Sequence, residues 1–182
     1  MTTRNITTQE QLQQLGRLEK DVTGIVLGTG NDQSATLLDL SDPPAWNQCF
    51  PNLRQLVIWS VSGLRVLQDL PQGLLSLEVC RAVDLQKIDG IPETLQRLVL
   101  EHNPQLQRVD FYTDQFPQLQ ELASSGCAAL PQNVLHAWIQ RSPQLEVLDL
   151  SQCPQLQSLL ANLARYSRQS PPPRQGRPRC RP

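Results

Sequence analysis

The sequence predicts a single solenoid domain of the α/β class, built from short parallel strands and the return segments between them. Two observations predict this fold. One pattern of apolar residues recurs along the chain at intervals of 18 to 26 residues. Leucine occupies 31 of the 182 positions, whereas Phe, Trp and Tyr together occupy only 8. A core of this composition must come from regularly spaced leucines, which argues against most compact enzyme folds of this size.

The repeat begins five times in register, and a weaker copy precedes these five. They read LRQLVIWSV from Leu53, LLSLEVCRA from Leu74, LQRLVLEHN from Leu95, LQELASSGC from Leu119 and LEVLDLSQC from Leu145, after ATLLDLSDP from Ala35. Each copy has apolar residues at its positions 1, 4 and 6, and this alternation is typical of a short half-buried strand. We expect about six coils, stacked so that one leucine row contains Leu56, Leu77, Leu98, Leu122 and Leu148.

A proline stands two or three residues before each strong copy: Pro51, Pro71, Pro92, Pro117 and Pro143. Proline has no N–H and favours extended geometry in the residue before it, so it is predicted to end each return segment. The residue before each proline is mostly apolar and is expected to point into the core: Phe50, Leu70, Ile91, Phe116 and Ser142.

The pattern LxxLxLxxN/C followed by xxL resembles that of leucine-rich repeat proteins over about residues 35–160, and the resemblance implies a short horseshoe. The copies with LPQGL and IPETL resemble repeats of bacterial effector proteins. In such repeats, by resemblance, position 9 forms a buried ladder of side-chain hydrogen bonds to the loop backbone. Here that position holds Pro43, Val61, Ala82, Asn103, Cys127 and Cys153. Because the first three depart from the pattern, we expect a looser or differently bonded turn in the N-terminal half.

Three segments are predicted: an N-terminal cap at 1–34, repeats at 35–166 and an Arg/Pro-rich tail at 167–182. In the cap, the capping box Thr7-Thr8-Gln9-Glu10 starts a helix over 8–20, and Val22, Ile25 and Leu27 form a first atypical strand. The longest copy has room for a helix near Pro131, with Val134, Leu135, Trp138 and Ile139 facing inward. A helical stripe from Leu156 to Tyr166 closes the last coil. The tail has no aliphatic residue and is expected to be disordered, and whether it is native or a reading-frame accident stays open.

Charge and targeting patterns favour a cytoplasmic protein that does not enter a membrane. The net charge of −1 excludes a strongly basic nucleic-acid binder. Residues 165–182 hold six arginines and no acid, so nucleic-acid binding is expected, at most, through the tail. No stretch is apolar enough for a membrane span, and the N-terminus lacks the apolar region of a signal peptide. The five cysteines are odd in number and form no CxxC pair, which indicates reduced thiols.

No motif of enzyme chemistry is found. Gly28-Thr29-Gly30 follows an apolar stretch but has no phosphate-loop ending and is read as a turn. His102 and His136 are the only histidines and have no paired ligand spacing, and no GxSxG motif occurs. We therefore expect no catalytic activity, no metal and no cofactor.

The candidate site is the concave strand face, where positions 3, 5, 7 and 8 of each copy project. Trp59 is the position that a structural role explains least, because it is a large aromatic residue at an outward strand position. Its neighbours include Arg81 and Arg97, and Trp and Arg are enriched at binding hot spots. Packing over a neighbouring side chain is the other interpretation of Trp59. The predicted partner-binding residues are Val57, Trp59, Glu78, Arg81, Arg97, Val99, Glu101 and His102.

The preferred function is a monomeric interaction or scaffold module that binds another protein without catalysis. Trp59→Ala and Arg97→Glu are then expected to weaken the partner without changing thermal unfolding. The alternative is the recognition part of a larger effector-type enzyme, such as a bacterial ubiquitin ligase, here without its catalytic domain. In this interpretation the protein is a translocated effector.

Overall fold

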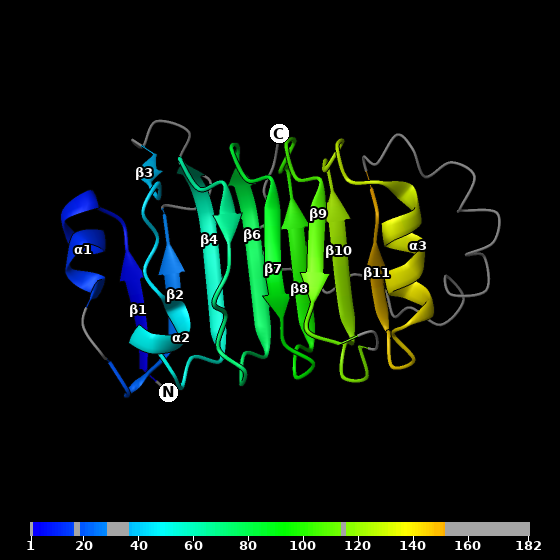
Figure 1. Ribbon diagram of the computed structural model, residues 1–182, viewed down its shortest axis with the longest axis horizontal. Coiled ribbons are helices and arrows are strands. Elements are labelled where there is room, and N and C mark those ends of the chain that lie inside the picture. The colour runs from blue at the N-terminus through cyan, green and yellow to red at the C-terminus, as the bar shows by residue number, and fades with distance from the viewer. Residues whose placement is uncertain (1, 17–18, 29–36, 114–115, 152–182) are drawn as a thin grey trace.

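The protein is a solenoid of parallel strands (Figure 1), seen in a computed structural model that describes residues 2–16, 19–28, 37–113 and 116–151. The main sheet has the strand order β1-β2-β4-β6-β8-β10-β11, and β3 pairs with β4. Its strands are β1 Thr2–Ile6, β2 Val22–Leu27, β3 Leu38–Asp39, β4 Gln55–Ser62, β6 Ser76–Ala82, β8 Arg97–Glu101, β10 Glu121–Ser125 and β11 Val147–Asp149. A second sheet, β5-β7-β9, contains Val66–Leu67, Lys87–Ile91 and Arg108–Phe111.

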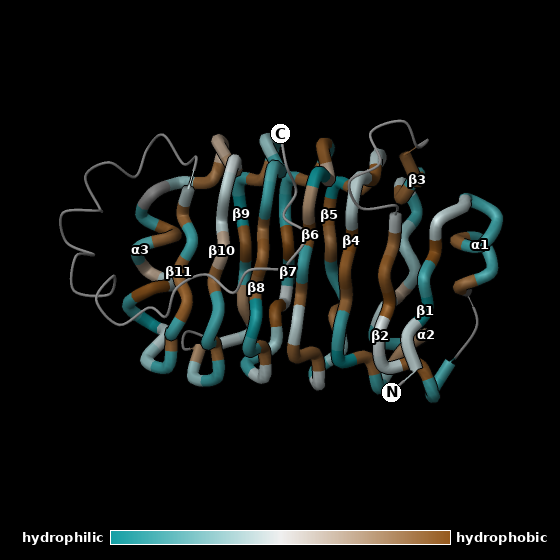
Figure 2. The backbone as a smooth tube through the Cα atoms, turned by 180° about the vertical axis from the view of Figure 1, so that it is seen from behind, coloured by the Kyte–Doolittle hydropathy of each residue, from teal (hydrophilic) through white to brown (hydrophobic). Residues whose placement is uncertain are grey.

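The predicted leucine row is confirmed by the pairing of the strands. Leu56 pairs with Leu77, Leu77 with Leu98, Leu98 with Leu122, and Leu122 with Leu148. The first four side chains have no exposed surface, and the last is half-buried. Figure 2 shows hydrophobic and hydrophilic segments recurring from strand to strand along the stack. One continuous core therefore runs between the two sheets, as expected for stacked repeats.

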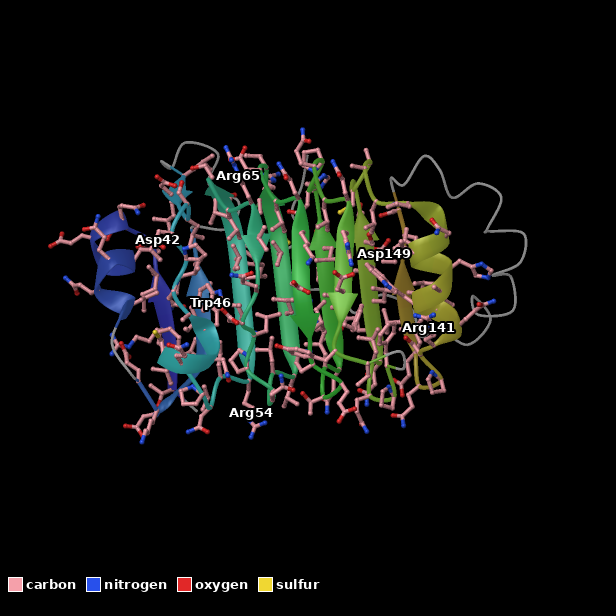
Figure 3. All side chains as sticks on the ribbon, viewed as in Figure 1. Asp42, Trp46, Arg54, Arg65, Arg141 and Asp149 are labelled. Atoms are coloured by element: carbon pink, nitrogen blue, oxygen red, sulfur yellow. The ribbon has the colours of Figure 1, made fainter. Side chains whose placement is uncertain are left out.

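Each coil turns at two corners. Backbone hydrogen bonds between residues three apart close the corner before the strands in all five strong copies, and the corner after the strands at Leu85, Leu106 and Leu130. At the corner before the strands, the N–H of each copy's first leucine donates to a carbonyl: Leu53 to Phe50, Leu74 to Pro71, Leu95 to Pro92, Leu119 to Phe116 and Leu145 to Ser142. The five prolines lie in these turns, as predicted, and the residue before each proline is buried. The polar one, Ser142, donates its hydroxyl to the Trp138 carbonyl at 2.7 Å. Arg54 and Arg65 lie at opposite edges of one coil (Figure 3).

The length of a coil decides what its return segment forms. The helices in the described residues are α1 Gln9–Gln13, followed by a 3₁₀ turn at Gln14–Gly16, α2 Trp46–Cys49 and α3 Gln132–Gln140. Coils of 21 and 24 residues return through the short strands of the second sheet, whereas the 26-residue coil accommodates α3. The expected α/β solenoid is thus mostly β, with few helices. In α3, Leu135, Trp138 and Ile139 are buried, as the sequence predicted.

The weaker copy from Ala35 does not form a coil in register with the others. Its Leu38 pairs with Val61 and not with Leu56, whose partner is Ile25 of β2. Strands β2 and β3 therefore lie along the first half and the end of the same strand, β4. The prediction of a separate coil here was wrong, because the segment around Val22–Leu27 already occupies that place beside β4.

The N-terminus differs from the predicted helical cap over 8–20. The capping box is present but uses Thr8 and Gln11, one residue later than predicted, and the helix ends at Gln13. Before this helix, β1 pairs with β2 in parallel. The sequence did not predict β1, because four of its five residues are polar, and these four are exposed. α1 lies beyond β1 at that end of the stack (Figure 1). The predicted C-terminal helical stripe and the tail lie outside the described residues. No helix among the described residues is long and apolar enough to cross a membrane.

Candidate functional site

The candidate site is the outer face of the main sheet, which is the side that points away from the leucine core. Strand alternation places positions 3, 5 and 7 of each copy on this face. From β4 to β11 it contains Gln55, Val57, Trp59, Ser76, Glu78, Cys80, Arg97, Val99, Glu101, Glu121, Ala123, Ser125, Val147, Asp149 and Ser151. Eight residues were predicted to bind a partner here, and six of them, apart from Arg81 and His102, are on this list.

Glu78 lies at the centre of a hydrogen-bonded cluster that spans four strands. Its Oε1 accepts a hydrogen bond from the Trp59 indole Nε1–H at 2.8 Å, and its Oε2 accepts one from Arg97 at 2.7 Å. The Arg97 Nε lies 3.1 Å from Glu121 Oε2, so the same guanidinium forms an ion pair with a second carboxylate. We call Trp59, Glu78, Arg97 and Glu121 the Glu78 cluster. It joins β4, β6, β8 and β10 across the outer face.

Arg97 remains charged in this cluster. Burial disfavours its charge, but the hydrogen bond to Glu78 and the charges of Glu78 and Glu121 outweigh burial and raise the pKa of Arg97. Its side chain is 25% exposed, and those of Glu78 and Glu121 are 12% and 20% exposed, so water screens these pairs only in part. The cluster is therefore a partly desolvated ion network and not a loose surface salt bridge.

A small apolar cluster accompanies these charges and is separate from the leucine core. Trp59 packs against Cys80, Val99 and Ala123, which are all buried. Both sequence-based interpretations of Trp59 thus describe part of its environment: it packs over neighbouring side chains, and it stays half-exposed. The indole is fixed by packing on one side and by its hydrogen bond to Glu78.

Val57 and Val99 are less accessible than the prediction assumed, since each is only 4% exposed. Val57 pairs directly with Glu78, and Val99 lies between Glu78 and Ala123. Neighbouring strands are about 4.8 Å apart, so these short side chains lie below the longer ones around them. They shape the floor of the outer face rather than its accessible surface.

Arg81 and His102 lie at the corner where the strands end. Both are at position 8, and both have left-handed backbone, with φ of 57° and 54°. Ser60 and Gly126, at the same position of other coils, are also left-handed. The left-handed backbone at this position bends the chain at the corner, which places Arg81 and His102 at the edge of the outer face. Glu101, at position 7, is half-buried on the face itself.

The sequence reasoning missed Glu121, Cys80 and Ala123 as members of the site. Glu121 was assigned to the face but not to the binding set, although the register places it directly opposite Arg97. Opposite charges at position 3 of adjacent copies are the signal that would have found it.

No three His, Cys, Asp or Glu side chains among the described residues lie close enough to hold a metal ion. Cys49, Cys80 and Cys127 form no disulfide, and the last two are buried. His136 lies on α3, where its ring contacts Gln140 at 3.1 Å. The outer face presents an aromatic ring, paired charges and a small apolar floor.

Comparisons of the chain with protein-family models, with curated proteins and with solved structures each find no match.

Proposed function

We propose that the coils are leucine-rich repeats and that the chain is a non-catalytic module that binds a partner protein on the outer face. Two features support the repeat assignment. One is the row of leucines at position 4, and the other is Asn103 at position 9. The Asn103 side chain is fully buried, accepts a hydrogen bond from Ala82 N–H at 3.0 Å and donates one to the Val79 carbonyl at 2.8 Å. These are the side-chain to backbone bonds that the resemblance implies for this position.

The observation that carries the binding proposal is the fixed, half-exposed indole of Trp59. A large aromatic side chain that is already held in one orientation loses little conformational entropy when it becomes buried by a partner. The Nε1–H is satisfied by Glu78, so a partner can cover the ring without leaving this donor unpaired. Hot spots at interfaces combine these properties: a Trp, a neighbouring Arg and a surrounding ring of polar groups.

The test compares two aromatic truncations on the two sides of the solenoid. Trp59→Ala removes the indole from the outer face, and Tyr112→Ala removes a 54% exposed ring beside the second sheet. For a partner isolated with the wild-type chain, we expect Trp59→Ala to raise the dissociation constant about 30-fold or more, because hot-spot truncations cost about 2 kcal/mol or more. Tyr112→Ala is expected to leave it unchanged. Equal effects of the two variants would reject the outer face as the binding surface.

Arg97 requires a different variant from the one that the sequence suggested. Arg97→Glu would place a third carboxylate between Glu78 and Glu121, so it would destabilise the fold as well as change the surface. Trp59→Phe is a better companion, since it keeps an aromatic ring but removes the hydrogen bond to Glu78. Binding that is retained in Trp59→Phe and lost in Trp59→Ala would assign the effect to the ring itself.

A further inference from the structure

Arg81 is a half-buried arginine whose side chain has no partner in the part of the chain that the structure describes. Arg97, the other arginine near Trp59, already donates to a carboxylate of the same face. The remaining described arginines without a partner, Arg65 and Arg141, are exposed to water. A half-buried guanidinium has lost part of its hydration without gaining an acceptor in return. A ligand that brings an anion to Arg81 would supply this missing acceptor.

Arg81 lies beside Trp59 at the edge of the outer face. Trp59 pairs with Cys80, and Arg81 is the next residue of the chain. Neighbouring strands are about 4.8 Å apart and rise about 3.3 Å per residue, so the Cα atoms of Trp59 and Arg81 are about 6 Å apart. One short segment of a partner can therefore cover the half-exposed indole and contact the guanidinium.

The row of side chains at position 8 contains a permanent positive charge and no carboxylate. From β4 to β10 it consists of Ser60, Arg81, His102 and Gly126. The first three have φ of 52°, 57° and 54°, a left-handed conformation that only glycine adopts without a cost in free energy. Such strained positions recur at binding sites. The charge of this row is complementary to an acidic ligand.

The carboxylates nearest to Arg81 along the chain have other partners. Glu78 accepts hydrogen bonds from Trp59 and Arg97, and Asp84 accepts one from the Gly63 N–H at 2.8 Å. Neither forms an ion pair with Arg81. The guanidinium of Arg81 is therefore available to an acceptor from outside the chain.

A single guanidinium fits a carboxylate better than a phosphate. Two parallel N–H groups of an arginine match the two oxygens of a planar carboxylate. A phosphate carries up to two charges and is usually held by several cations or by a group of backbone N–H donors. Arg97 cannot serve as the second cation, because Glu78 and Glu121 already pair with it.

We propose that Arg81 gives the outer face its charge specificity, by pairing with an aspartate or glutamate side chain of the partner beside the residue that covers Trp59. The inference rests on the proposed function, since it names the chemistry of the partner at that site. The binding hot spot then consists of Trp59 and Arg81, whereas Arg97 stays in its ion network with Glu78 and Glu121.

A phage-displayed library of random peptides tests this chemistry without a known partner. Peptides that bind the full wild-type chain but not Trp59→Ala are kept, and they are expected to share an acidic residue at a fixed spacing from an apolar one. Selection against Arg81→Glu should replace this acidic residue by lysine or arginine. Selection against Arg65→Glu, which changes an exposed arginine at the same edge of the stack (Figure 3), should return the wild-type pattern.

The affinity of one selected peptide separates this proposal from the proposed function. Arg81→Gln is expected to raise its dissociation constant about 10-fold or more, because a hydrogen bond between charged groups is lost, and Arg65→Gln should leave it unchanged. The urea midpoints of both variants should equal that of the wild-type chain. An unchanged dissociation constant in Arg81→Gln, or binders without an acidic residue, would overturn the proposal and leave the binding role of Trp59 intact. A library without any Trp59-dependent binder would reject both.

Discussion

The coils of the first and second halves of the solenoid close the same corner in different ways. In the first half, position 9 is Val61 or Ala82, and strands β4 and β6 run through the corner for 8 and 7 residues. Val61 and Ala82 are paired with each other in the ladder. In the second half, β8 and β10 are only 5 residues long, and position 9 is Asn103 or Cys127. In the second half, the side chain at position 9 makes the hydrogen bonds that backbone pairing makes in the first half.

The change from backbone pairing to side-chain hydrogen bonds at position 9 occurs between β6 and β8. Ala82 N–H, which has passed the end of the pairing with β8, donates to Asn103 Oδ1. The Asn103 amide donates to the position 6 carbonyl of the preceding coil, and the Cys127 thiol, 3.4 Å from the Leu100 carbonyl, repeats this contact one coil later. A corner with an apolar residue at position 9 needs a longer strand, and a corner with a polar one does not. The predicted difference between the two halves is therefore confirmed as a difference in bonding.

The largest expected effect comes from removing the side chain that closes the polar corner. Asn103→Ala leaves the Ala82 N–H and the Val79 carbonyl buried without their partner, so it should lower the free energy of unfolding by about 2–4 kcal/mol. Urea denaturation measures this loss. Asn133→Ala, at an exposed position of α3, is the matched control and should change the free energy by less than about 0.5 kcal/mol. Equal losses in both variants would show that the corner does not depend on Asn103.

A second contrast lies at position 8, where every one of these corners is left-handed. Gly126 has φ of 67°, and a Cβ there would come within 2.7 Å of His102 Nδ1. Gly126→Ala should therefore cost about 1–2 kcal/mol for the backbone alone, and more if His102 cannot move. Thermal or urea unfolding gives the difference from the wild-type chain.

The counterpart in the first half is Arg81→Gly, at the same position of an apolar corner. Here the substitution relieves left-handed strain of about 1–2 kcal/mol but adds chain entropy to the unfolded state, so a gain of less than about 1 kcal/mol is expected. A loss in Arg81→Gly as large as that in Gly126→Ala would mean that side-chain contacts, and not backbone geometry, decide position 8.

Period-two patterns with strong leucine spacing made the core predictable from the sequence. Leu56, Leu77 and Leu98 pair as expected because a shift of one residue would move every leucine to the other face. Strand β1 was not predictable, since Thr2, Thr3 and Arg4 give no apolar alternation. The strands of the second sheet are as short as two residues, and their alternation is too brief to distinguish from a loop.

The strand face that holds the candidate site was predictable, but the contacts between its side chains were not. Positions 5 and 7 identified Glu78 and Trp59, but nothing in their spacing along the chain indicates that one carboxylate accepts hydrogen bonds from both Trp59 and Arg97. Those bonds depend on side-chain rotamers across three strands. The burial of Val57 and Val99 depends in the same way on the lengths of the side chains around them.

The smallest expected effect is a dependence on pH at the first apolar corner, where β3 meets the end of β4. Hydrogen bonds from the hydroxyl and the backbone N–H of Ser41 lower the pKa of Asp39. A carboxylate whose pKa is lower in the folded state stabilises the fold fully above the unfolded pKa, near 3.8, and loses this contribution as the pH falls through the folded value.

Asp39→Asn should therefore reduce the acid-induced loss of stability between neutral pH and pH values below 3.8. Urea denaturation at both ends of this range measures it, with Asp21→Asn, in the exposed turn before β2, as the matched control. Identical acid sensitivity in Asp39→Asn and the wild-type chain would mean that the Ser41 contact contributes nothing to the corner, and that β3 is held there by its backbone pairing with β4 and its hydrogen bonds with the Gln9 side chain.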